Sequence, residues 1–301
     1  MTPSDLPVTY LDGAALTGGG AVVISAVWGL KDTIDRTTRI LHVADDVVSY
    51  IDVPENIISV VQVPDGTGTV IGLAKSGVVL PVFPELGTPE PMGRSGASKL
   101  ISLHANADEQ FACGLNGQIY RRTHGHWQPF DDGLYTPKVS SISPHLRGIA
   151  GRSRDEMLVT VGLFGMIAEF GGGEWTKVEI PTNCSFENLV EVRRGEFLVC
   201  GDRGLLAVGS SGSWSIADTG TNVTFWDVDK FQGKLFLSSF DGIFEYNTKR
   251  ESIQQVDFDM GFMPGTYKLS ASTTELWSFG QDSILCFDGR NWRRLKIPSN
   301  G

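Results

Sequence analysis

Short apolar runs alternate with glycine-rich breaks along the whole chain. The stretch LVTVGLFGMIAEFGGGEW, residues 158–175, shows the full pattern: two apolar runs flank a turn with two glycines, and a glycine cluster then precedes a tryptophan. Three further stretches repeat it, namely FACGLNGQIYRRTHGHW, FLVCGDRGLLAVGSSGSW and, more loosely, LWSFGQDSILCFDGRNW. Self-similarity of this kind indicates a repeat protein, in which each unit buries its apolar surface against its neighbours.

The spacing of the turn and the tryptophan defines the repeat. In three copies the second glycine precedes the tryptophan by ten residues, as in the pairs Gly117 and Trp127, Gly165 and Trp175, and Gly204 and Trp214. Equivalent turn positions follow one another at 38 to 48 residues, at Gly77, Gly117, Gly165, Gly204, Gly242 and Ser283. One more period toward the N-terminus reaches Gly29, which gives seven units.

Each unit divides into four short strands with polar or glycine-rich breaks, and no segment shows a sustained helical period. Seven such units predict an all-β fold, a seven-bladed β-propeller of four-stranded antiparallel blades in one domain over residues 1–301. The predicted blades are residues 6–53, 57–84, 99–132, 147–181, 187–218, 223–257 and 266–298.

The glycine turn, the apolar strand and the late tryptophan together resemble the WD40/YVTN/BNR-like propeller superfamily, and especially repeats of the photosystem II stability factor type. The resemblance covers nearly the whole chain and implies architecture only. The chain has neither the GH and WD dipeptides of true WD40 repeats nor a clean Asp-box, so no functional residue is transferred. We expect the repeat tryptophans to pack between blades, and the ring to close without a strand shared by its two ends.

Composition limits the class of partner. The formal net charge is -10, and 41% of the residues are hydrophobic, so the chain can bury a sizeable core. Nucleic acid and anionic membranes would require clustered Lys and Arg, whereas a basic protein partner fits the charge. The alternative is that the acidity only maintains solubility. Four scattered cysteines and the absence of a signal-peptide pattern at the N-terminus favour a cytoplasmic protein with reduced thiols, and we expect a monomer in the unbound state.

The chain contains no complete enzymatic motif. The stretch GLAKSG lacks the first glycine of a phosphate-binding loop, GTGTVI fails the dinucleotide pattern, and GSSGS has the wrong spacing for a nucleophile elbow. The pair His124 and His126 and the carboxylate pairs near strand ends are interpreted as solvated turn residues, although carboxylates facing each other across a cleft could serve a glycosidase. We therefore expect no catalytic residues, no metal site and no cofactor.

Recognition is instead expected on the propeller face formed by the second-to-third strand turns and the connections between blades. Phe164 and Phe240 fall at turn tips, where an aromatic side chain has no use in the fold. Three interblade connections are long, and one of them carries Phe262 and Met263 beside acidic residues. The predicted partner-binding set is Asp32, Asp35, Asn116, Tyr135, Phe164, Asp202, Arg203, Phe240, Asp241, Phe262, Met263 and Asp282.

Two classes of function remain open. The favoured class is a non-catalytic protein-binding propeller, either a bacterial immunity protein that neutralises a cognate toxin or an assembly factor that holds a client subunit. The other class is a carbohydrate-binding or carbohydrate-hydrolysing propeller. That class would require tryptophans at the channel mouth, yet four of the seven belong to the repeat position.

Overall fold

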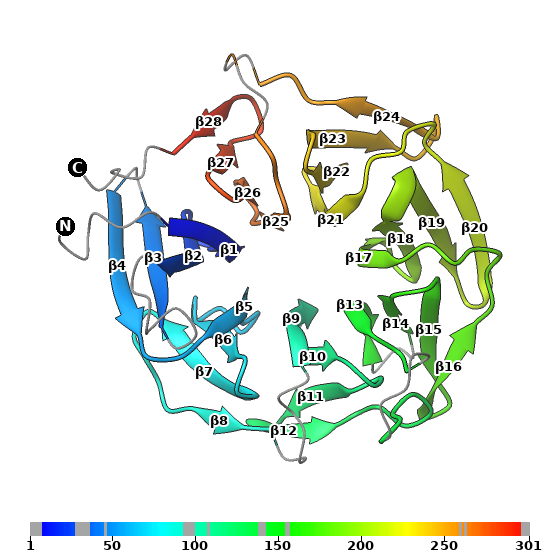
Figure 1. The fold of residues 1–301 in the computed structure, drawn as a ribbon, viewed down its shortest axis with the longest axis horizontal. Helices are drawn as coiled ribbons and strands as arrows, with labels where there is room; N and C mark the ends of the chain where they lie inside the picture. The colour runs from blue at the N-terminus through cyan, green and yellow to red at the C-terminus, as the bar shows by residue number, and fades with distance from the viewer. Residues whose placement is uncertain are drawn as a thin grey trace.

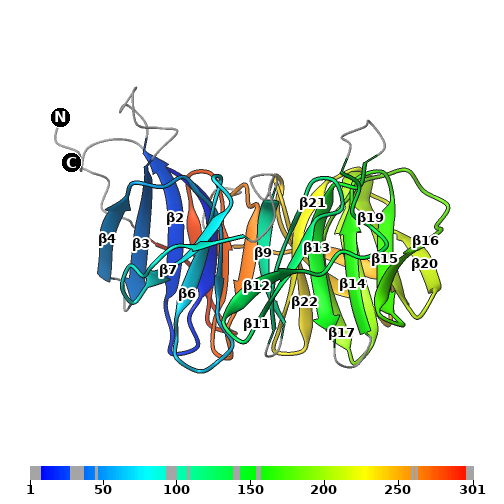
Figure 2. The ribbon, with the colours of Figure 1, turned by 90° about the horizontal axis from the view of Figure 1, so that it is seen from below.

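The structure, a computed structural model, describes residues 8–27, 37–44, 47–92, 100–106, 109–137, 143–153, 157–258, 261 and 264–295. These residues form seven four-stranded antiparallel sheets arranged as a ring, and no α-helix occurs among them (Figure 1). The first strands of all seven sheets line a cavity at the centre of the ring, called here the channel. The predicted seven-bladed β-propeller is therefore confirmed. Figure 2 shows the ring from its side, with its two faces above and below.

Each blade is a contiguous stretch of chain whose first strand lines the channel and whose fourth strand lies at the rim (Figure 1). The strands of blades one to four are β1 (Val8–Ala15), β2 (Ala21–Val27), β3 (Thr38–Ala44), β4 (Val47–Val53), β5 (Ile57–Gln62), β6 (Val70–Ala74), β7 (Val78–Phe83), β8 (Glu90–Pro91), β9 (Leu100–Asn106), β10 (Glu109–Gly114), β11 (Ile119–Thr123), β12 (His126–Pro129), β13 (Leu146–Arg152), β14 (Met157–Gly162), β15 (Met166–Gly171) and β16 (Glu174–Val178). Those of blades five to seven are β17 (Phe186–Arg193), β18 (Glu196–Gly201), β19 (Leu205–Ser210), β20 (Ser213–Asp218), β21 (Phe225–Phe231), β22 (Lys234–Ser239), β23 (Gly242–Asn247), β24 (Ser252–Gln255), β25 (Lys268–Ala271), β26 (Leu276–Phe279), β27 (Ile284–Phe287) and β28 (Trp292–Arg294).

Blade two extends further than the sequence pattern predicts. The segment after residue 84 was expected to be an interblade connection, but it contains β8, which pairs with β7 through Val78 and Val79. A strand of only two residues, one of them a proline, has no alternation to reveal it. Rim strands tolerate proline because their outer N–H groups need no partner in the sheet.

Each gap between adjacent blades holds one apolar cluster. The cluster between blades three and four joins Phe111 and Cys113 to Leu158 and Trp175, all of which are buried. Trp175 also donates a hydrogen bond of 2.7 Å from Nε1 to the carbonyl oxygen of Phe130 in the preceding blade. The repeat tryptophans of blades three, five and seven lie in the corresponding clusters, so their expected place between blades is confirmed.

The ring closes by packing blade one against blade seven, with no shared strand, as expected. The ring of Phe279 covers Gly13, where an added Cβ would overlap it. Two hydrogen bonds of 2.9 Å join the blades, one from the Ala15 amide to Ser270 Oγ and one from the Gly20 amide to Glu275 Oε2. The Tyr10 amide also donates to the Gln281 carbonyl oxygen at 3.3 Å, so closure rests on packing and isolated hydrogen bonds rather than on a mixed sheet.

A belt of polar contacts links the first strands around the channel. Asp12 of blade one accepts hydrogen bonds from Ser59 Oγ and the Val60 amide of blade two. Asp227 of blade six accepts one from the Leu269 amide of blade seven at 2.8 Å. It also accepts one from the Asn188 side chain of blade five. Because buried polar groups are costly unless paired, these contacts fix blade one to blade two and blade six to both of its neighbours.

Candidate functional site

The candidate site is the face formed by the second-to-third strand turns and the connections that enter the next blade, called here the turn face. In blades three, four and five the turn is a two-residue loop whose second residue is a glycine with positive φ. Such primed turns match the twist of the flanking strands but require left-handed backbone at both positions. At Gly165 the requirement is strict, because a Cβ would also collide with the Thr182 carbonyl oxygen.

Phe164 occupies the first position of the blade-four turn with φ of 59°, although its side chain is 66% exposed. A bulky residue is rare in this conformation, where Asn or Gly is preferred. The side chain borders a shallow groove of about 420 Å³ whose lining includes Met166, Lys177 and Ile180. The ring is two-thirds exposed and belongs to neither apolar cluster beside blade four, so its burial does little to offset the backbone strain and the residue is a candidate for binding.

Replacing Phe164 by Asn should raise the free energy of unfolding by about 1 kcal/mol, because Asn accepts left-handed backbone at lower cost. Urea denaturation would measure the change. A decrease in stability would show that the Phe164 ring supports the fold and would remove it from the candidate site.

Phe240, at the tip of the blade-six turn, is 65% exposed and belongs to an aromatic cluster. Its ring centroid lies 6.4 Å from that of Tyr267, and Trp226 lies 6.2 Å from Tyr267 on the same face. The turn is fixed from blade seven, because the Thr266 amide donates to the Ser239 carbonyl oxygen at 2.8 Å. The cluster therefore presents aromatic surface on a rigid support.

Trp226 was not predicted as a site residue, and a repeated bulge explains its position. In six blades the first strand skips one residue in its pairing with the second strand, and this residue lies near the turn face. The skipped residues are Leu11, Ile58, Ile101, Arg147, Glu187 and Trp226. Leu11 is 43% exposed and Trp226 is 37% exposed, so large apolar side chains border the channel mouth. Aligning the starts of the seven first strands would have revealed them.

The other predicted residues are distributed unevenly. Asp241 and Asp282 are exposed on the turns of blades six and seven, close to Phe240. Arg203 is exposed on the turn of blade five, beside the half-buried Asp202. Tyr135 is half-buried on the connection after blade three. Asn116 is a correction: it is only 2% exposed and has φ of 60°, so it serves the turn and offers no surface to a partner. Asp32, Asp35, Phe262 and Met263 lie outside the described residues.

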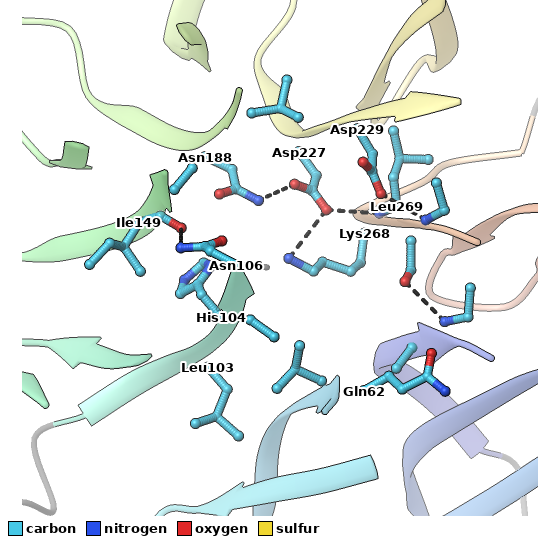
Figure 3. Close-up of a pocket in the computed structure, with 18 of the residues that line it drawn as sticks. Gln62, Leu103, His104, Asn106, Ile149, Asn188, Asp227, Asp229, Lys268 and Leu269 are labelled. Atoms are coloured by element: carbon cyan, nitrogen blue, oxygen red, sulfur yellow. Dashed lines mark hydrogen bonds and ion pairs between the residues drawn. The ribbon is translucent and has the colours of Figure 1, made fainter. Parts of the chain in front are cut away.

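The opposite side of the channel holds a polar cavity of about 490 Å³ (Figure 3). Lys268 points into it, and its Nζ lies 3.3 Å from Asp227 Oδ2. Burial acts to lower the pKa of Lys268, but the carboxylates of Asp227, Asp12 and Asp229 outweigh it and raise the pKa. Burial and the nearby Lys268 lower the pKa of His104 to about 3. Lys268 is therefore charged and His104 neutral at physiological pH.

Asp229 makes the stability of the protein depend on pH. Burial, and then the charge of Asp227, raise the pKa of Asp229 to about 6, above its ordinary value. Between about pH 4 and 6 the folded state therefore holds more protons than the unfolded state, so stability falls as the pH rises. Asp229→Asn should remove this fall and should stabilise the protein by about 1 kcal/mol at pH 8, after allowance for one weakened hydrogen bond. Urea denaturation at pH 4, 6 and 8 tests this, and an unchanged pH profile would contradict it.

Within the described ranges, no group of three or more His, Cys, Asp or Glu side chains could hold a metal ion. No helix among the described residues has the length and apolarity needed to cross a membrane. The described part of the turn face offers exposed aromatic and charged side chains on fixed turns, an arrangement suited to contact with a macromolecule.

No protein-family model matches the chain. Over 187 residues, 62% of the chain, it is 30% identical to immune protein Tsi7 of Pseudomonas aeruginosa. The chain is thus similar in sequence to an immune protein. It spans 60% of the length of that relative.

Solved structures share the fold over almost the whole chain. YCF48 bound to a D1 peptide matches with a TM-score of 0.65 and 15% identity, covering 93% of this chain and 91% of that one. The WD40 propeller domain of Doa1 matches with a TM-score of 0.68 and 14% identity, covering 93% and 92%. The resemblance expected from the repeat is confirmed at the level of the fold.

Proposed function

We propose that this protein is an immunity protein that binds a cognate protein toxin through its turn face and blocks it without catalysing a reaction. The similarity to immune protein Tsi7 carries the proposal. The turn face is the proposed binding surface, because Phe164 and Phe240 are exposed there and do not contribute to the buried core. Exposed aromatic side chains held in a fixed position are typical anchors of protein interfaces.

The chemistry of the partner follows from charge. With a formal net charge of -10, the protein attracts a basic toxin and repels nucleic acid and acidic partners. We propose that it acts as a monomer in the cytoplasm, where a toxin that has entered the cell, or was made there, would be neutralised. No cofactor is required for inhibition by occupation of a surface.

Coexpression tests the proposal. The product of the gene adjacent to that of this protein should arrest bacterial growth when it is expressed alone. Coexpression with this protein should restore growth, and the two purified proteins should elute together as a complex. Failure of every adjacent gene product either to arrest growth or to bind would overturn the proposal.

A further inference from the structure

We propose that the groove between the blade-six and blade-seven turns is a subsite for one cationic side chain, Arg or Lys, of the bound toxin. The inference rests on the proposed function, because it assigns one contact within the turn face. The groove has a volume of about 290 Å³, and its lining includes Phe240, Gly265, Tyr267, Asp282 and Arg294. This lining combines aromatic walls with a carboxylate.

The two aromatic walls are set at an angle. The rings of Phe240 and Tyr267 are inclined by 60° in an edge-to-face arrangement with their centroids 6.4 Å apart, and the Phe240 side chain remains 65% exposed. Trp226 continues the aromatic surface on the Tyr267 side, inclined to it by 56°. Open aromatic faces attract ammonium and guanidinium groups through the quadrupole of the ring.

The charges around the groove favour a cation. Asp241 follows Phe240 on the same turn and Asp282 lies in the groove lining, and both residues are exposed. The one cationic residue of the lining, Arg294, donates from Nη2 to the backbone carbonyl oxygen of Asp282 at 3.2 Å. Within the lining, Asp282 and Arg294 balance each other in charge. Asp241, exposed on the adjoining turn, adds one negative charge beside the groove. An apolar occupant would desolvate the Asp282 carboxylate without pairing it, which is costly.

The groove is formed before any partner arrives. Ser239 Oγ accepts from the Asp241 amide at 3.0 Å and donates to the Gly242 carbonyl oxygen at 3.0 Å, which holds the turn that carries Phe240. Gly265 lies beside the Phe240 ring, where a Cβ would stand 3.7 Å from Phe240 Cδ2. Because little is left to order on binding, the entropic cost of the contact is small.

The probe is N-acetyl-arginine amide, titrated into the full-length protein at low salt and followed by NMR shifts of the Gly265 and Tyr267 amides. N-acetyl-norleucine amide and N-acetyl-glutamate amide serve as neutral and acidic comparisons. We expect saturable binding of the arginine probe that is at least about tenfold tighter than that of either comparison. Binding of the norleucine probe with equal affinity would overturn the proposal, as would preferred binding of the glutamate probe at Arg294.

Variants make the assignment specific. Phe240→Ala should abolish the shifts, and the pair Asp241→Asn with Asp282→Asn should weaken arginine binding by about tenfold. Phe164→Ala removes an equally exposed aromatic ring from the same face and should leave arginine binding unchanged. An equal loss in that control would overturn the assignment to this groove.

The outcome separates the subsite from the proposed function. Specific arginine binding without any inhibitory complex would support the cationic subsite and contradict the immunity role. A toxin complex whose affinity is unaffected by the two Asp→Asn changes would support the immunity role and contradict the cationic subsite.

Discussion

Replacing Asp227 by Ala should lower the free energy of unfolding by about 3 kcal/mol, because a buried acceptor of several hydrogen bonds and the ion-pair partner of the partly exposed Lys268 is removed. The carboxylate of Asp227 is only 2% exposed and connects three blades, through Asn188, its own strand and Leu269. Its removal leaves the Leu269 amide and the Asn188 side chain without their acceptor and takes away the ion-pair partner of Lys268. The midpoint of urea denaturation, followed by tryptophan fluorescence, measures the loss.

A surface ion pair provides the matched control. Lys234 Nζ lies 2.8 Å from Glu245 Oε2 in the same blade, but both side chains are well exposed. Glu245→Ala should therefore cost less than about 1 kcal/mol. If Asp227→Ala cost no more than this control, the polar belt would not be what fixes the blades around the channel.

The double variant Phe164→Ala with Phe240→Ala should weaken binding of the cognate toxin by roughly a hundredfold, about 2.8 kcal/mol, if both rings anchor the interface. Its stability should change little, because each ring is about two-thirds exposed and neither belongs to an interblade cluster. Calorimetric titration of the toxin into wild-type and variant protein measures the affinity, and thermal unfolding checks the fold.

Val47→Ala is the comparison for that experiment. Val47 is 68% exposed on β4 at the rim of blade one, away from the turn face, and its replacement should leave toxin affinity unchanged. Full retention of affinity in the double phenylalanine variant would assign the interface to another surface. Unfolding of the variant would show instead that the two rings belong to the core.

The fold was predictable from sequence because each blade repeats the same physical requirements at a nearly constant spacing. Gly165 and Gly204 mark turns that no larger residue can form, and Trp175 marks the strand that packs on the preceding blade. Each repeat alone indicates the fold only weakly, but seven repeats at a regular spacing indicate it more strongly than a single clear motif would. The short β8 strand was missed because it carries no such signal.

The candidate site was only partly predictable. Phe164 and Phe240 were found because an aromatic residue at a turn tip contradicts the turn's own preference. Trp226 was missed because its exposure depends on a strand bulge, which breaks the alternation of the strand and is recognisable only when the first strands of the blades are aligned. Asn116 was misassigned because sequence alone does not show that its turn is covered.

Because the ring closes without a shared strand, such a protein can evolve by gain or loss of whole blades. Each sheet is encoded by one uninterrupted segment, so duplication or loss of a segment adds or removes a whole blade and leaves every remaining ladder of backbone hydrogen bonds complete. Only the interfaces at the junction must adapt. A recombination event within the gene can therefore transfer a turn with its entire supporting sheet, which allows the recognition surface to be exchanged in intact blocks.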